Sequence, residues 1–104
     1  MGTLYYGSAR TAVKVDDRIL AHLKVLIVSK LRRNEPFLVS WSEPSSEGFG
    51  RSSVWIHNSL DLIFRFDGGR QPELDKELLE QMANEALGPT GVHIDASMAR
   101  FWNR

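Results

Sequence analysis

The chain has 104 residues, and its 13 lysine and arginine side chains balance 13 aspartate and glutamate side chains. A chain of this length holds about one compact domain, and a net charge of zero excludes a global electrostatic attraction to nucleic acid or to membranes. The sequence contains no cysteine, which excludes disulfides, thiolate metal sites and cysteine nucleophiles.

No segment is typical of a membrane protein or of an exported protein. The longest apolar run, residues 25–28, is far shorter than the roughly 20 residues that a membrane-spanning helix needs. The N-terminus has neither the basic start nor the apolar run of a signal peptide. We therefore expect a cytoplasmic protein with no membrane partner.

The first third of the chain predicts a hairpin followed by a helix. Residues 3–6 and 11–15 have the composition of strands and flank a Gly-Ser turn. The helix begins at Asp16 or Asp17, whose carboxylate can cap it, and ends near Arg33. Apolar residues at helical spacing predict its buried stripe. These residues are Ile19, Leu20, Leu23, Leu26, Ile27 and Leu31.

The middle of the chain predicts three strands. Residues 37–41 form the first, and the polar residues 42–50, which contain glycine and proline, predict a mobile loop. Strands at residues 51–57 and 60–66 follow, and we expect them to be neighbours joined by a tight turn. In the last of these, apolar and other residues alternate with a period of two, as in a half-buried strand.

The last third predicts a second helix from Pro72 to about Leu87 and a short strand at residues 92–94. The inward face of this helix comprises Leu74, Leu78, Met82 and Ala86. The order β-β-α-β-β-β-α-β predicts an α+β fold, with a mostly antiparallel sheet of about five to six strands and two helices packed on one face. We expect a single domain spanning residues 1–104, with residues 96–104 either part of it or a flexible tail.

Two segments carry a family resemblance: residues 16–41, DDRILAHLKVLIVSKLRRNEPFLVSW, and residues 50–69, GRSSVWIHNSLDLIFRFDGG. They resemble a family of small bacterial proteins of unknown function, whose members are often labelled ATP-dependent DNA ligase. The likeness extends over nearly the whole chain. It implies a small domain of the same kind and, through the label, a connection with DNA ligation.

The ligase label implies a lysine nucleophile in the motif K-x-D-G. Lys14 and Asp16 match this motif, but Asp17 stands in place of the glycine that lies beside the nucleotide. A carboxylate there would repel the ATP phosphates, and a strand end followed by a helix cap accounts for these residues more simply. The residues weigh against an enzyme without deciding the question, and we expect no catalytic residue, no metal and no cofactor.

The first helix is strongly basic, with five cations and no acidic residue from Arg18 onward. At about 100° per residue, one side of this helix is predicted to present Arg18, His22, Ser29, Arg32 and Arg33 away from the buried stripe. This side is either a strip that contacts phosphates or a solvated face whose last cations complement the helix dipole.

The strands add an aromatic residue to this basic surface. Alternation places Trp55 on a face that the helices need not cover, beside Arg51 and with Arg65 on the neighbouring strand. An exposed tryptophan there would stack on bases, whereas the alternative is partial burial. The predicted nucleic-acid-binding residues are Arg18, His22, Arg32, Arg33, Arg51, Trp55 and Arg65.

Self-association is the second part of this hypothesis. Val25 and Val28 lie off the buried stripe, and the second helix is as acidic as the first is basic, so the two helices can pair between copies. With Phe101 and Trp102 of the tail, these valines form the predicted interface of a homodimer. The sequence thus favours a non-catalytic binding module, nucleic-acid-binding and self-associating. The alternatives are a protein-interaction subunit and an accessory to ATP-dependent DNA ligation.

Overall fold

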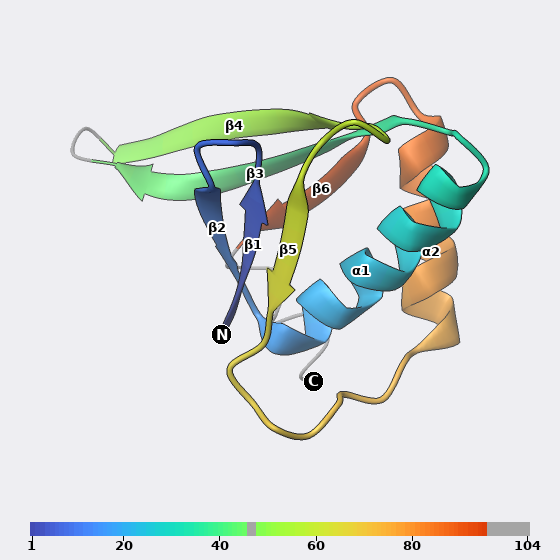
Figure 1. Cartoon of the computed structure of the whole chain (residues 1–104), viewed down its shortest axis with the longest axis horizontal. Coiled ribbons are helices and arrows are strands. Elements are labelled where there is room, and N and C mark those ends of the chain that lie inside the picture. Colours follow the sequence, from blue (N-terminus) through green and yellow to red (C-terminus); the bar gives the residue numbers. More distant parts are fainter. Residues whose placement is uncertain (46–47, 96–104) are drawn as a thin grey trace.

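The computed structural model describes residues 1–45 and 48–95 of the chain, and Figure 1 shows how their helices and strands are arranged. The predicted α+β class and element order are confirmed. The elements are β1 (Gly2–Tyr6), β2 (Thr11–Val15), α1 (Asp17–Arg32), β3 (Phe37–Ser45), β4 (Gly48–Ile56), β5 (Leu62–Arg65), α2 (Lys76–Leu87) and β6 (Val92–Asp95).

The six strands form two three-stranded sheets rather than one, with the orders β2-β1-β5 and β4-β3-β6. All strand pairs are antiparallel except β3 with β6, which run parallel. The predicted turn between β4 and β5 exists, because the amide of Leu60 donates to the carbonyl of His57 over 3.1 Å. The predicted pairing of these two strands is wrong, since β4 pairs with β3 and β5 pairs with β1.

The predicted loop at residues 42–50 is also wrong for the part that the structure describes. The backbone of β3 continues to Ser45 and that of β4 begins at Gly48, and the two pair along their whole length. Figure 1 shows them as a long two-stranded arm. Pairing with a neighbouring strand overrides the local composition here, because strand formation depends more on context than on the residue itself.

Helix α1 begins and ends as its sequence predicts. The carboxylate of Asp16 accepts from the amide of Arg18 over 3.1 Å at the N-terminus, which confirms the strand end and helix cap. Asn34 adopts a left-handed φ of 54° just after the C-terminus. Within the described residues, neither helix is long and apolar enough to cross a membrane.

Helix α2 begins later than predicted. Its N-cap is Asp75, whose carboxylate accepts from the amides of Glu77 and Leu78, and Pro72 lies in the preceding loop. Leu74 therefore precedes the helix and is 48% exposed, so its predicted inward position is wrong.

The core lies between the helices and the inner faces of both sheets. The predicted stripe of α1 is buried, with Leu31 partly so. The ring of Tyr6 from the first sheet meets Trp41 of the second edge to face, with centroids 6.0 Å apart. Figure 1 shows α1 and α2 side by side, running in the same direction at one end of the molecule. Helix α1 contacts β1, and α2 contacts β3 and β6, so each sheet has a helix against it.

Candidate functional site

Three of the five cations in and just after α1 already contact carboxylates. Arg18 lies 3.3 Å from Asp75, and Lys30 and Arg33 lie 3.3 and 3.5 Å from the same carboxylate oxygen of Glu35. These ion pairs neutralise much of the positive charge on this helix. They therefore weaken the hypothesis of a phosphate-binding strip along α1.

His22 is fully buried, so its predicted outward position is wrong. Its Nε2 accepts a hydrogen bond from the amide of Asp75 over 2.7 Å. Its Nδ1 lies 2.6 Å from the carbonyl oxygen of Arg18 and must therefore carry the proton and donate. Helix α2 packs against the side of α1 that was expected to face solvent, and His22 joins the two helices.

The outer face of the β4-β3-β6 sheet brings together polar and aromatic side chains from three strands. Alternation sends the buried residues of each strand to the core and leaves the intervening ones outside. The register places Leu38 opposite Trp55, and Ser40 opposite both Ser53 and His93. We define the outer sheet face as Leu38, Ser40, Arg51, Ser53, Trp55 and His93.

The geometry of the outer sheet face suits a planar or anionic ligand. Trp55 is 54% exposed, and the hydroxyls of Ser40 and Ser53 are hydrogen-bonded to each other over 2.7 Å. A shallow hollow of about 900 Å³ lies over this face, and Arg51 and His93 are among the residues that line it. Among the side chains that the structure describes, no carboxylate lies within ion-pairing distance of Arg51. The face thus offers an indole ring, hydroxyl groups and a guanidinium group.

The structure divides the predicted nucleic-acid-binding residues among three places. Arg51 and Trp55 share the outer sheet face, whereas the four residues predicted on helix one stay with α1. Arg65 lies on β5, opposite Thr3 of β1, in the other sheet. Sequence reasoning missed His93, because the parallel pairing that brings β6 beside β3 leaves no local signal.

A second surface runs along α1. Two hollows, of about 270 and 480 Å³, share Lys24 and Val25 in their linings and therefore form one groove. We define the α1 groove by seven of the residues that line these hollows: Ala21, Lys24, Val25, Val28, Arg32, Phe66 and Leu74. The linings also include the polar side chains of Ser29, Arg33, Arg70 and Gln71.

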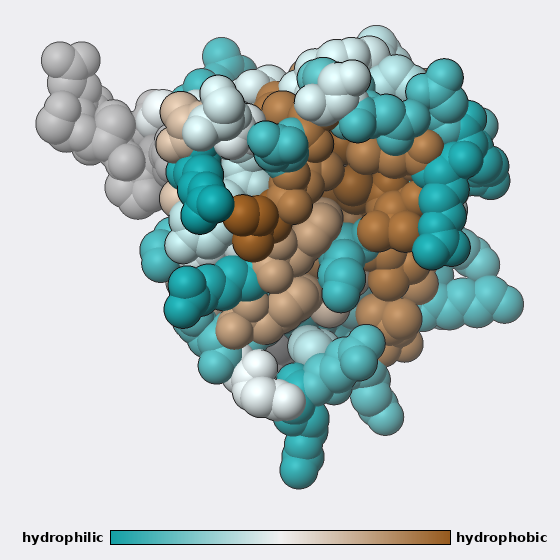
Figure 2. Space-filling view, in the orientation of Figure 1, coloured by the Kyte–Doolittle hydropathy of each residue, from teal (hydrophilic) through white to brown (hydrophobic). Residues whose placement is uncertain are grey.

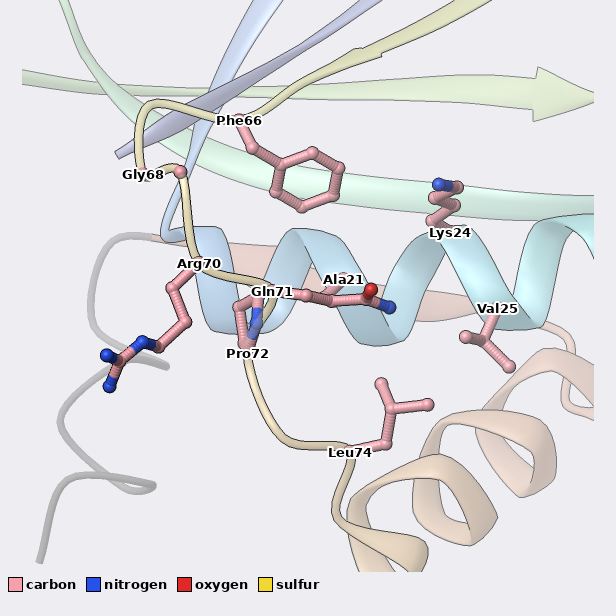
Figure 3. Close-up of a pocket in the computed structure, with 10 residues that line it drawn as sticks. Ala21, Lys24, Val25, Phe66, Gly68, Arg70, Gln71, Pro72 and Leu74 are labelled. Atoms are coloured by element: carbon pink, nitrogen blue, oxygen red, sulfur yellow. The ribbon is translucent and has the colours of Figure 1, made fainter.

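The α1 groove exposes apolar surface beside positive charge. Val25 is 38% exposed, and Figure 3 shows its side chain and that of Leu74 pointing towards each other. The ammonium group of Lys24 lies 5.8 Å from the centroid of the Phe66 ring. Figure 2 shows apolar residues gathered on the face of the molecule that carries α1 and β5, with hydrophilic residues around them. The predicted interface residues Phe101 and Trp102 lie outside the described residues.

Within residues 1–45 and 48–95, no group of three or more histidine, aspartate or glutamate side chains could hold a metal ion. A model of the family described as Domain of unknown function (DUF7882) matches residues 1–97, in agreement with the resemblance to a family of unknown function. No curated protein and no solved structure matches the chain.

Proposed function

The chain belongs to this family of domains of unknown function, and we propose that it is a non-catalytic binding module with two binding surfaces. The outer sheet face binds single-stranded nucleic acid, and the α1 groove mediates self-association. The observation that carries the first assignment is the exposed indole ring of Trp55 on one sheet face with Arg51.

The chemistry of the outer sheet face supports single strands over duplexes. Unpaired bases stack on an exposed aromatic ring, and each such contact contributes about 1–3 kcal/mol without regard to sequence. Arg51 lies four residues before Trp55 on the same face of β4, about 13 Å away along the strand. A guanidinium at that position reaches a neighbouring phosphate through charge-assisted hydrogen bonds. In a duplex the bases are already stacked and the ring has no partner.

The electrostatics of the outer sheet face predict weak dependence on salt. The guanidinium of Arg51 supplies its positive charge, so about one phosphate is neutralised. The logarithm of the binding constant should fall with the logarithm of the salt concentration with a slope of about −0.7. A strip of five free cations along α1 would give a slope of about −3.5. The slope therefore distinguishes the two surfaces.

The experiment is fluorescence anisotropy with a labelled oligothymidylate and a labelled duplex, each titrated at several salt concentrations. We expect Trp55→Ala to weaken binding to the single strand about tenfold or more, and Trp55→Phe to weaken it less. Arg51→Met should make the salt slope shallower. Arg65→Met is the matched control, because Arg65 is exposed on the other sheet, and its substitution should change neither the affinity nor the salt slope. Flat titrations of the wild type, or equal losses in the Arg51 and Arg65 variants, would overturn the assignment.

Self-association is supported by the exposed apolar residues of the α1 groove. Val25 is 38% exposed and Leu74 is 48% exposed, and both line the same hollow. A soluble protein tends to cover such neighbouring apolar side chains with a partner. Sedimentation equilibrium over a wide range of protein concentrations tests whether the chain dimerises. A monomer at every concentration would end this part of the proposal.

A further inference from the structure

We propose that the outer sheet face recognises the sugar of the strand that it binds, and that its preferred ligand is single-stranded RNA rather than single-stranded DNA. This inference rests on the proposed binding of single strands and names the kind of strand. It is carried by a polar row between the indole ring of Trp55 and the guanidinium of Arg51. We define the hydroxyl row as Ser53, Ser40 and His93, which are neighbours across β4, β3 and β6.

Three kinds of chemical group follow one another along β4 on the outer sheet face. Trp55, Ser53 and Arg51 lie two residues apart, so consecutive members are separated by about 7 Å along the strand. Their order is indole, hydroxyl and guanidinium. A nucleotide presents its base, sugar and phosphate in the same order, because the sugar joins the base to the phosphate. With a base stacked on Trp55 and a phosphate at Arg51, the sugar lies over Ser53.

The neighbouring strands continue this order across the sheet. Leu38 of β3 is opposite Trp55, so it adds apolar surface beside the indole ring. Ser40 of β3 is opposite Ser53 on one side and opposite His93 on the other. The polar groups that a ligand can contact are therefore concentrated in the hydroxyl row, where the sugar lies.

The hydroxyl row has hydrogen-bonding capacity that the protein does not use. The hydroxyls of Ser40 and Ser53 lie 2.7 Å apart at an exposed position, and either of them can donate to the other. Each hydroxyl has one donor and two acceptor sites, so this bond leaves a donor and several acceptor sites free. The ring of His93 is exposed and, when neutral, adds a donor and an acceptor. The row can therefore donate to an incoming hydroxyl group and accept from it at the same time.

The hollow over the outer sheet face gives the sugar and its phosphate room. All three members of the hydroxyl row line this hollow of about 900 Å³, together with Arg51 and Leu38. Among the described residues that line it, none is a carboxylate that would repel a phosphate. Trp55 does not line the hollow but is opposite Leu38, which does. A base stacked on Trp55 thus lies beside the hollow, with its sugar towards the hydroxyl row.

A ribose uses the hydrogen-bonding capacity of the hydroxyl row, and a deoxyribose does not. The 2′-hydroxyl of RNA is both a donor and an acceptor, and it is the group by which a protein distinguishes RNA from DNA. A deoxyribose in the same place displaces water from the row and offers no hydrogen bond in return. A site that hydrogen-bonds a hydroxyl of its ligand discriminates against the analogue that lacks it, because the polar groups of the site are left unpaired.

Fluorescence anisotropy with three labelled strands of equal length and the same base tests this inference. The strands are an oligouridylate, an oligodeoxyuridylate and a 2′-O-methyl oligouridylate. We expect the wild type to bind the oligouridylate about three- to tenfold more tightly than the oligodeoxyuridylate, which is the effect of one net hydrogen bond. The 2′-O-methyl strand has lost the donor, so it should bind no more tightly than the oligodeoxyuridylate.

Variants of the two serines locate the effect. Ser40→Ala combined with Ser53→Ala should lower RNA binding to the level of the oligodeoxyuridylate and leave binding of the latter within about twofold of the wild type. Ser53→Thr keeps the hydroxyl and should keep the preference for RNA. Ser59→Ala is the matched control, at an exposed serine in the turn after β4, and should change neither affinity.

The outcomes separate this inference from the proposed function. Equal affinities of the wild type for the oligouridylate and the oligodeoxyuridylate would overturn recognition of the sugar but leave the binding of single strands standing. A preference for RNA that persists in the double alanine variant would do the same. A wild type that binds none of the three strands would overturn both.

Discussion

The backbone amide of Asp75 donates a hydrogen bond of 2.7 Å to Nε2 of His22, although the two residues lie 53 positions apart in the sequence. This bond sets where α2 begins, because the same residue, Asp75, also caps the helix with its carboxylate. His22 was predicted to lie on the basic surface, but through this bond it connects the two helices.

His22→Ala should therefore destabilise the fold. The substitution leaves the Asp75 amide without its partner and opens a cavity where a fully buried ring was. We expect a loss of about 2–4 kcal/mol in the free energy of unfolding, measured by urea denaturation. Ser29→Ala, at an exposed position on the same helix, should change it by less than about 0.5 kcal/mol. Equal stabilities for the two variants would show that His22 does not join the helices.

Two glycines with positive φ should respond differently to alanine. Gly7 has a φ of 78° and Gly91 a φ of 70°, but a Cβ at Gly7 would meet open space, whereas one at Gly91 would collide with the carbonyl oxygen of Leu38. Gly7→Ala should lower the free energy of unfolding by about 1 kcal/mol through backbone strain. Gly91→Ala should lower it by about 3 kcal/mol or more, because overpacking is added to strain. Thermal unfolding of both variants makes the comparison, and similar melting temperatures would contradict it.

The two partners of the Lys30–Glu35 ion pair should not be equivalent. Lys30 is 7% exposed and Glu35 remains in contact with solvent. Glu35→Gln leaves a buried ammonium without its carboxylate and should destabilise the fold by about 1 kcal/mol. Lys30→Met removes the buried charge, keeps the apolar stem and should leave stability unchanged or raise it. Urea unfolding of both variants tests this, and a larger loss in the free energy of unfolding for Lys30→Met than for Glu35→Gln would contradict it.

Trp55→Ala should leave the fold intact. The indole ring is 54% exposed on the outer sheet face, so its removal opens no internal cavity. We expect a change of less than about 1 kcal/mol in the free energy of unfolding. Because of this, the loss of nucleic-acid binding in the same variant reports on the ring itself. A melting temperature far below that of the wild type, measured by circular dichroism, would show that Trp55 has a structural role instead.

The parts of the fold that follow from local patterns could be predicted from the sequence. The stripe of α1 is buried as its helical spacing indicates, Asp16 caps the start of the helix, and Asn34 follows its C-cap residue. In β5 and the residues around it, Leu62 and Phe64 are half-buried while Ile63 and Arg65 are exposed, as alternation predicts. Each of these features depends on residues a few positions apart.

The parts that depend on distant contacts could not be predicted. The turn at Asn58 gives no sign that the strands on either side of it join different sheets. The burial of His22 depends on α2, whose position is set by residues more than 50 places away. For the candidate site, alternation identified the face of Trp55, but the separation of Arg65 from it follows from strand order alone.

The most direct test of nucleic-acid binding at the outer sheet face is a ¹⁵N–¹H correlation spectrum of the protein titrated with an oligothymidylate. We expect shifts of the Trp55 indole N–H and of the backbone amides of Ser40, Arg51 and Ser53, with the amides of α1 unchanged. Shifts confined to α1, or no shifts at saturating oligonucleotide, would contradict it.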